Sequence, residues 1–154
     1  MKKLLFVCSG NTCRSPLAEA LTRQAAASRN LSLEVTSAGT FAVAGAPASP
    51  EAIRAAARRG ADLSTHRSRP LEAGILSEAD LVVAMTPAHQ RIIRTEHGRE
   101  LNVVLATDYL PPDHARHGEP VSDPFGGDME EYEEVARLLE QCIEGILYRV
   151  SETG

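Results

Sequence analysis

The sequence predicts an α/β fold in which four parallel strands form one sheet with helices on both faces. Short apolar runs alternate with helix-like runs through all 154 residues, as in folds built from strand–helix–strand units. Residues 4–7 form an unbroken apolar run, which is typical of a strand covered on both faces. No repeat, low-complexity tract or linker divides the chain. Residues 1–154 are therefore expected to form a single domain.

The first half of the chain supplies two strands and two helices. Pro16 suits the first turn of a helix, where its missing N–H is not needed, and apolar residues with helical spacing follow over about residues 15–28. Leu and Val alternate with polar residues over 31–35, which predicts the second strand. Residues 40–50 are rich in Gly, Pro and Ala and are expected to be a loop, either a plain connection or a wall of an active site. A Pro-Glu pair then begins a helix over residues 50–58.

The third and fourth strands follow in the second half. Residues 66–70 read as a polar turn, and a short helix-like piece around 71–76 comes next. The apolar run 81–85 predicts the third strand, and a Thr-Pro pair then begins a helix that continues to residue 93. Residues 101–105 predict the fourth strand. Helices between successive strands imply right-handed crossovers.

Two long segments complete the chain. Residues 107–128 form a loop rich in Pro, Gly and His, and a loop of that length inside a compact domain is usually functional. The last helix is expected over residues 129–150, with its apolar side chains on one face. Cys142 lies on that face and is expected in the core.

Composition and charge exclude several classes of protein. The formal net charge of -5, with no basic cluster among aromatic residues, argues against a nucleic-acid binder. No stretch is long and apolar enough to span a membrane, and the N-terminus leads into a strand rather than a signal peptide. Three cysteines, an odd and small number, predict free thiols in a reducing cytoplasm. Cys8 and Cys13 have no partners at zinc-like spacing, so no metal is expected.

The strongest candidate for a functional site is the loop at residues 8–15, between the first strand and the first helix. Ligands of open α/β sheets bind where strands end, and the amides of a tight loop and of a helix's first turn attract anions. Arg14 can grip two phosphate oxygens at once. The same field is expected to lower the pKa of the Cys8 thiol, and Ser15 could donate a hydrogen bond to the thiolate. A charged nucleophile beneath phosphate donors indicates covalent phosphoryl transfer.

The same pattern has a plain structural interpretation. A cysteine at a strand end is often a small buried hydrophobic residue, and an arginine that opens a helix is often solvated. A Cys, a short spacer, an Arg and a Ser occur together by chance in unrelated chains. The strand before the loop, the helix after it, and the Gly and Asn inside it favour the catalytic interpretation.

Asp123, near the end of the long loop, is the best candidate for an acid. Pro124 fixes its own φ and biases Asp123 toward an extended conformation, so that the carboxyl group can be aimed. Phosphoryl transfer to a thiolate needs an acid that protonates the departing atom. An isolated Asp-Pro pair is common in turns, so the assignment depends on the Cys8 loop.

Together these motifs resemble the low-molecular-weight protein-tyrosine phosphatases. The resemblance rests on residues 8–15 with Pro16 and on Asp123-Pro124 before a C-terminal helix. It extends to Ser37-Ala38-Gly39, Ala79-Asp80-Leu81-Val82 and Ala84-Met85. It implies the flavodoxin-like, three-layer fold of the phosphotyrosine protein phosphatase I type, and an enzyme without a cofactor.

The resemblance also implies residue roles. Cys8 would be the nucleophile, Arg14 the phosphate clamp, and Asp123 the general acid that becomes the base when water hydrolyses the cysteinyl-phosphate. Hydrogen bonds from Asn11, Ser15, Ser37 and His66 would hold the loop in its strained shape, although on sequence alone His66 is an ordinary turn residue. The phosphate-binding residues would be Ser9, Gly10, Asn11, Thr12, Cys13, Arg14 and Ser15.

The chain departs from the tyrosine-specific members at positions that would contact substrate. Those members typically carry Ile or Leu in place of Thr12, with aromatic residues around a slot for the phenol. Here there is no Trp, residues 40–50 offer only Phe41, and Asp123 is followed by a single ring, Phe125. Residues 10–16 together with residues 123–127 resemble the corresponding motifs of the bacterial protein-arginine phosphatases of the same fold. This resemblance implies phosphoarginine in proteins as the substrate, with Asp123 bonded to the guanidinium, Phe125 stacked on its plane and Thr12 orienting the phosphate. Phosphotyrosine is the alternative.

Further expectations concern partners and other classes. The partners would be phosphorylated proteins, with no nucleic acid and no membrane, and the chain would act as a monomer. A disulfide between Cys8 and Cys13 could protect the nucleophile from over-oxidation, or Cys13 could simply pack under the loop. Arsenate reductases share the nucleophile loop but use an additional cysteine pair that this chain lacks. An anion-binding or redox-sensing module without turnover is the non-enzymatic alternative.

Overall fold

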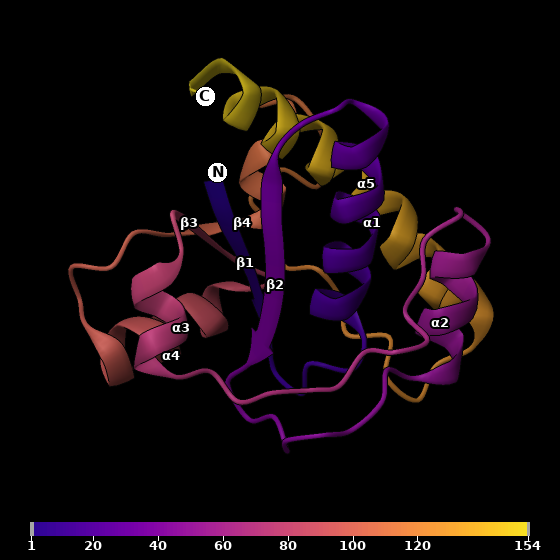
Figure 1. Cartoon of the computed structure of the whole chain (residues 1–154), viewed down its shortest axis with the longest axis horizontal. Coiled ribbons are helices and arrows are strands. Elements are labelled where there is room, and N and C mark those ends of the chain that lie inside the picture. The colour runs from indigo at the N-terminus through magenta and orange to yellow at the C-terminus, as the bar shows by residue number, and fades with distance from the viewer. Residues whose placement is uncertain (1, 154) are drawn as a thin grey trace.

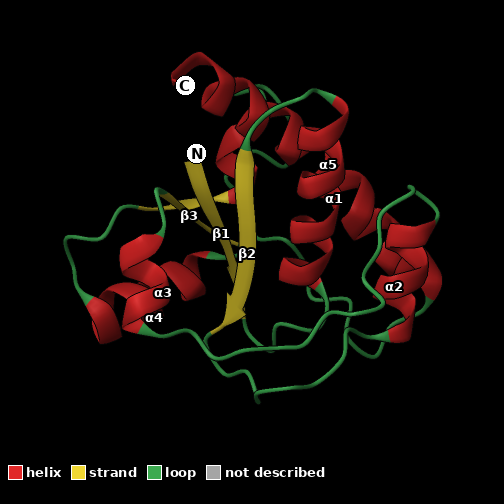
Figure 2. Ribbon diagram, in the orientation of Figure 1, coloured by secondary structure: helices red, strands yellow, loops and turns green. Residues whose placement is uncertain are grey.

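The computed structural model describes residues 2–153, and its centre is a four-stranded parallel sheet in the order β2–β1–β3–β4. The strands are β1 (Lys2–Cys8), β2 (Leu33–Gly39), β3 (Leu81–Ala84) and β4 (Val103–Leu105). In the register, Cys8 pairs with Gly39 and Val7 with Ala84, so neighbouring strands end at the same edge. The loops gather below that edge in Figures 1 and 2. This arrangement confirms the predicted flavodoxin-like sheet.

Helices cover both faces of the sheet and complete three layers (Figure 1). One layer contains α1 (Arg14–Ser28), α2 (Pro50–Ala57) and α5 (Met129–Thr153), which pack against one another. The other contains α3 (Ala73–Glu78) and α4 (Pro87–His97). Within residues 2–153 no helix is long and apolar enough to cross a membrane.

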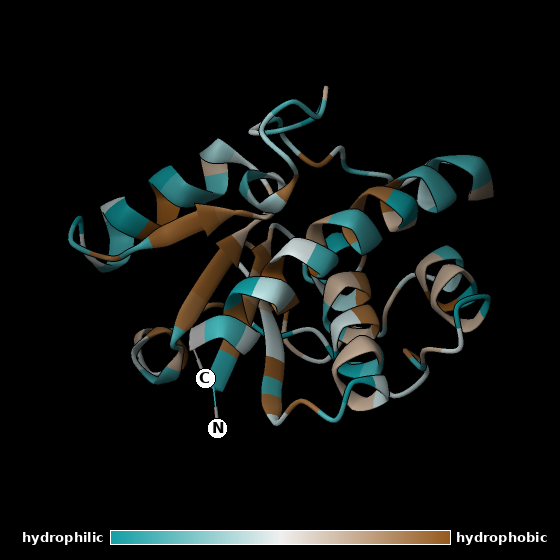
Figure 3. Ribbon diagram, turned by 90° about the horizontal axis from the view of Figure 1, so that it is seen from above, coloured by the Kyte–Doolittle hydropathy of each residue, from teal (hydrophilic) through white to brown (hydrophobic). Residues whose placement is uncertain are grey.

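The sheet separates two hydrophobic clusters. Side chains of β1 alternate between them, as a strand's period of two requires: Leu4, Phe6 and Cys8 join the cluster with α1 and α5, while Leu5 and Val7 join the cluster with α3 and α4. In Figure 3 the strands are largely apolar, while the helices beside them mix hydrophilic and apolar residues. Cys8 is therefore the last inward residue of β1 and lies at the point where the chain leaves the core.

Several element boundaries differ from those predicted. The second strand continues to Gly39 because it pairs along the whole length of β1, which alternation within its own sequence does not reveal. The predicted long loop begins inside a short 3₁₀ helix, Ala106–Tyr109, and the short third helix lies slightly later than expected. These shifts leave the order of elements unchanged.

Gly39 lets the end of β2 approach the functional loop closely. A Cβ at this position would lie 2.3 Å from the backbone oxygen of Ser9 and 3.1 Å from the Cβ of Asn11. Just beyond it, the amides of Thr40 and Phe41 donate to the carbonyls of Cys8 and Ser9, both at 2.9 Å. The β2 end thus supports the loop at backbone distance.

Candidate active site

The loop at residues 8–15 runs from the end of β1 to the N-terminus of α1. Cys13 occupies the N-cap position of α1 and makes no side-chain capping bond, and the first turn contains no acidic residue. The free amides and the positive end of the helix dipole are therefore not neutralised by a side chain of this helix's first turn. Such a helix start favours an anion in the loop.

Cys8 lies at the base of this loop and is only 2% exposed. Its Sγ is 2.9 Å from the hydroxyl oxygen of Ser15. Burial raises the pKa of the thiol, while the Ser15 hydroxyl, the backbone groups of Ser15 and Asn11 and the charge of Arg14 lower it. The effect of burial is the larger, so the lowered pKa predicted from the sequence is wrong for this structure. The prediction counted the donors around the sulfur and left out the cost of removing a thiolate from water.

Arg14 is 5% exposed. The two terminal nitrogens of its guanidinium group have partners, whereas its Nε has none among residues 2–153. Its Nη1 donates to the carbonyl of Val121 at 3.0 Å, and its Nη2 lies 3.7 Å from Oδ2 of Asp123. Its buried Nε has no hydrogen-bond partner within the described part of the chain. A buried donor without a partner costs free energy, and a tetrahedral oxyanion in the loop is the kind of group that would satisfy it.

A hydrogen-bond network centred on Asn11 fixes the shape of the loop. Asn11 is fully buried and has a positive φ of 57°, which is unusual for a residue other than glycine. Its Nδ2 donates to the hydroxyls of Ser15 at 2.8 Å and Ser37 at 2.9 Å. Its Oδ1 accepts from the amide of Arg69 at 3.0 Å, and its carbonyl lies 2.8 Å from Nε2 of His66. The structure thus brings together the four residues that the resemblance placed around the loop.

Sequence reasoning missed the outer part of this network. The Ser37 hydroxyl donates to Oε1 of Glu19 at 2.6 Å, and Oε2 of Glu19 pairs with Nη1 of Arg23 at 2.8 Å. Nε of Arg69 donates to the carbonyl of Ser37 at 3.0 Å. The available signal was a carboxylate within the apolar part of α1, since a buried Glu requires partners.

Asp123, on the long loop, faces Arg14 and is oriented by a turn. Its Oδ1 accepts from the amide of Phe125 at 3.1 Å, while its other oxygen faces Arg14. The side chain of Asp123 is about half exposed, which leaves it accessible to a ligand at the mouth. Phe41 and Phe125 are 70% and 73% exposed, so both predicted rings stand free at the surface.

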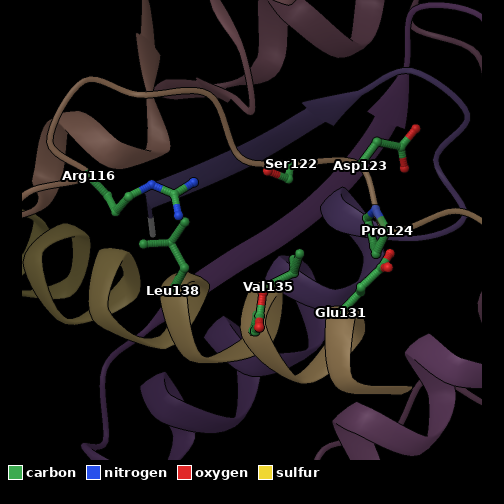
Figure 4. A pocket seen from close by; sticks show the side chains of 8 residues that line it. Arg116, Ser122, Asp123, Pro124, Glu131, Val135 and Leu138 are labelled. Carbon is green, nitrogen blue, oxygen red and sulfur yellow. The ribbon is translucent and has the colours of Figure 1, made fainter. Parts of the chain in front are cut away.

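A cavity of about 260 Å³ lies beside Asp123, between the long loop and the start of α5. Figure 4 shows Ser122, Asp123 and Pro124 on the loop side, with side chains of α5 pointing toward them. Its lining residues are Arg116, Ser122, Asp123, Pro124, Glu131, Glu134, Val135 and Leu138. The cavity shares Asp123 with the candidate site, and none of its lining residues belongs to the loop at residues 8–15.

Cys13 faces a different environment from Cys8. Its Sγ lies 3.3 Å from the hydroxyl of Tyr132 on α5 and 3.5 Å from the hydroxyl of Ser49. The predicted apolar role of Cys142 in the core agrees with its complete burial on α5. All three cysteines are free thiols.

His89, at the start of α4, is a site residue that the sequence analysis did not identify. Its Nε2 lies 2.9 Å from Oγ of Ser9, and its Nδ1 lies 3.0 Å from Oγ1 of Thr86. Burial lowers the pKa of His89 to about 4, and the charge of Arg14 acts in the same direction. The ring is therefore neutral near pH 7. The signal in the sequence was its place just after the end of β3, on the same sheet edge as Cys8.

Comparison with known proteins gives one consistent family. The family described as low molecular weight phosphotyrosine protein phosphatase matches residues 3–154. The protein-arginine-phosphatase of Bacillus subtilis is 40% identical over 141 residues, 91% of each chain. A probable low molecular weight protein-tyrosine-phosphatase, EpsP, of Ralstonia nicotianae is 32% identical over 158 residues, 100% of this chain and 99% of the relative.

A solved structure agrees with these sequence relatives. A YwlE mutant from Bacillus subtilis superimposes with a TM-score of 0.89 at 36% identity and covers 98% of this chain and 99% of its own. Family and fold thus agree over nearly the full length. The chain belongs to the low molecular weight phosphotyrosine protein phosphatase family.

Proposed function

We propose that this chain is a cysteine-dependent protein phosphatase that hydrolyses phosphoarginine in proteins through a cysteinyl-phosphate. One observation carries the proposal. The buried Cys8 sulfur lies 2.9 Å from the Ser15 hydroxyl at an open helix N-terminus, and the buried Nε of Arg14 nearby has no hydrogen-bond partner among residues 2–153. This set offers a nucleophile and several phosphate donors in one loop.

Before the first chemical step, the Cys8 thiol gives its proton to solvent water, a loss that burial makes costly. The thiolate sulfur then attacks phosphorus while the loop amides and Arg14 donate to the phosphoryl oxygens. The S–P bond forms and the P–N bond breaks. Asp123 gives its proton to the departing guanidine nitrogen, so the product leaves without an unstable negative charge. Its position 3.7 Å from Nη2 of Arg14 supports that role, because the acid then lies beside the phosphate clamp.

In the second step, the Asp123 carboxylate takes a proton from water as the water oxygen attacks phosphorus. The S–P bond breaks, inorganic phosphate leaves, and the Cys8 sulfur regains its electron pair. Ser15 donates to that sulfur as it departs, which lowers the cost of the thiolate in a buried position. Atoms and charges balance over the two steps, and water is the only co-reactant.

Three residues support arginine rather than tyrosine as the substrate side chain. Thr12 is half-buried in the loop and is short and polar. Phe125 is exposed directly after the acid, where its ring can stack on a planar guanidinium. Phe41 is the other exposed ring near the loop, and it bonds the Ser9 carbonyl through its amide. The 40% identity to a protein-arginine-phosphatase, against 32% to a protein-tyrosine-phosphatase, points the same way; phosphotyrosine remains the alternative substrate.

A paired assay tests this proposal. Turnover is measured on a phosphoarginine protein and on a phosphotyrosine peptide, with Cys8→Ser as the inactive control. We expect a higher kcat/KM on phosphoarginine, and a phosphorylated Cys8 should accumulate in Asp123→Ala. A preference for phosphotyrosine would favour the alternative. Thioredoxin-coupled arsenate reduction, or phosphate binding without any turnover, would overturn the phosphatase assignment.

The setting of the enzyme follows from its nucleophile. Residues 1–154 would act as one catalytic domain and as a monomer on phosphorylated proteins in the cytoplasm, since a cysteine nucleophile needs a compartment that keeps thiols reduced. Under oxidation, Cys13 would form a protective disulfide with Cys8. That step requires the Cys13 sulfur to leave its contacts with Ser49 and Tyr132.

A further inference from the structure

A buried histidine that the two-step mechanism does not use joins the phosphate loop to the start of α4. His89 is 3% exposed, and Ser9, its partner at Nε2, directly follows the nucleophile in sequence. Its partner at Nδ1 is Thr86, the residue that caps α4. Each ring nitrogen therefore has a hydroxyl partner, which fixes the orientation of the ring.

We propose that Thr86 and His89 position the Ser9 hydroxyl as an additional hydrogen-bond donor to the phosphoryl group of the substrate. The inference rests on the proposed phosphatase function. With an anion in the loop, Thr86 donates to Nδ1, the Nε2–H donates to Ser9 Oγ, and the Ser9 proton turns to a phosphoryl oxygen. His89 is thus a positioning residue that acts through Ser9.

The cap of α4 is compatible with this direction of the hydrogen bonds. Oγ1 of Thr86 already accepts from the amide of His89 at 3.2 Å. A hydroxyl can accept two hydrogen bonds and donate one, and we assign the Thr86 proton to Nδ1. A neutral imidazole that accepts at Nδ1 carries its proton at Nε2, and burial keeps the ring neutral by lowering its pKa to about 4. Ser9 Oγ then accepts from the ring, and its own proton is available to a ligand.

The surroundings place Ser9 beside the reacting groups. Ser9 is half-buried, between the buried Cys8 and the exposed Gly10. The charges of Arg14 and Asp123 both act on the His89 ring, so the ring lies within electrostatic reach of the clamp and the acid. Loop amides donate in fixed directions, whereas a hydroxyl can rotate as the phosphoryl oxygens move toward the transition state.

Nuclear magnetic resonance of the full chain tests the direction of the hydrogen bonds from Thr86 through His89 to Ser9. The protein carries ¹⁵N-labelled histidine and is saturated with inorganic phosphate, and His89→Gln identifies the signals of His89 among the five histidines. We expect the neutral Nε2–H tautomer between about pH 6 and pH 8. The Nδ1–H tautomer would overturn the proposal, because Ser9 would then donate to the ring rather than to the anion.

The affinity for inorganic phosphate tests whether the Ser9 hydroxyl donates a hydrogen bond to the anion. We expect Ser9→Ala and His89→Leu each to weaken inorganic phosphate binding about tenfold, the size expected for one hydrogen bond to an anion. The double variant should also lose about tenfold, because both changes remove the same donor. His89→Gln, which keeps an amide donor near Nε2, should recover most of the affinity. A hundredfold loss in the double variant, or wild-type affinity in Ser9→Ala, would overturn the proposal.

The control variant is His97→Leu, at the other end of α4, which should bind phosphate as the wild type does. Thermal melting checks that each variant is folded, and Ser9→Ala retains the whole core if His89→Leu does not fold. One outcome is that the protein turns over neither phosphatase substrate and still shows the Nε2–H tautomer, with the double variant losing no more phosphate affinity than each single variant. That result would overturn the proposed function alone. Normal turnover with an Nδ1–H tautomer would overturn the positioning role alone.

Discussion

The residues around Cys8 act against the cost of burying a sulfur anion. Burial raises the pKa of the thiol, and the Ser15 hydroxyl is the strongest of the groups that lower it. Ser15 is itself fixed by Nδ2 of Asn11 at 2.8 Å. Because Asn11 donates to the Ser15 oxygen, the Ser15 proton is left to point at the sulfur. The network therefore orients the Ser15 hydroxyl that contacts the Cys8 sulfur.

Replacing Ser15 with Ala should raise the pKa of Cys8 further. The loss of a hydrogen bond to a charged group, about 1.5–3 kcal/mol, corresponds to a rise of roughly one to two pKa units. The pH dependence of Cys8 alkylation by iodoacetamide, followed by mass spectrometry, measures the shift, and kcat should fall at least about tenfold. Ser77→Ala, on the exposed side of α3, is the matched control. An unchanged pKa in Ser15→Ala would show that the hydroxyl does not stabilise the thiolate.

Thr12 is the single residue on which the proposed preference for phosphoarginine over phosphotyrosine can be tested most directly. We expect Thr12→Ile to lower kcat/KM on a phosphoarginine protein and to raise the relative activity on a phosphotyrosine peptide, because a bulky aliphatic side chain crowds the polar guanidinium. A change of about tenfold in the ratio corresponds to about 1.4 kcal/mol. Thr95→Ile, on the exposed part of α4, should leave the ratio unchanged. The specificity argument fails if both variants keep the wild-type ratio.

At the scale of elements, two strand ends and one helix start meet with little room between them. The Cβ that Gly39 lacks would fall 2.3 Å from the Ser9 oxygen and 2.9 Å from the Cβ of Ala42. Backbone atoms cannot give way as a flexible side chain does. The end of β2 therefore sets the position of the loop segment that follows Cys8.

Gly39→Ala should displace this segment. We expect a loss of about 1–3 kcal/mol of stability from overpacking and a fall of at least about tenfold in kcat/KM from the shifted loop. Urea unfolding and steady-state kinetics measure the two effects. Gly74→Ala is the control, since a Cβ there meets no atom within 4 Å. Wild-type kinetics in Gly39→Ala would mean that the loop does not depend on this close approach.

The elements also show where sequence reasoning succeeds. The order of strands and helices could be predicted from periodicity. In residues 4–7 and on the apolar face of α5, the spacing of apolar residues itself indicates which side chains are buried. The partners of the buried polar groups could not be predicted in this way. Glu19, His89 and Tyr132 each bind residues far away in sequence, so only the packed chain reveals them. The raised pKa of Cys8 has the same origin, since the extent of burial is a property of the whole fold.

For the whole molecule, the functional edge is tied to both sides of the sheet. Asn11 connects the loop to β2 and to the turn at Arg69, while Ser9 connects it to α4 through His89. Val121 and Asp123 hold Arg14 from the long loop. The site is thus assembled from segments distributed over the chain, and it is expected to lose its geometry together with the global fold.

The buried neutral His89 makes the stability of the whole chain depend on pH in the acid range. Its pKa is lowered from 6.5 to about 4 in the folded protein, so the unfolded chain binds the proton more readily between these values. The stability linked to this group is present above about pH 6.5 and is lost as the pH falls toward 4. The loss between pH 7 and pH 5 should be about 2 kcal/mol. Urea unfolding at the two pH values measures it, and His89→Gln, which does not titrate, should lose less stability by that amount. Equal losses in the two proteins would show that folding does not lower the pKa of His89.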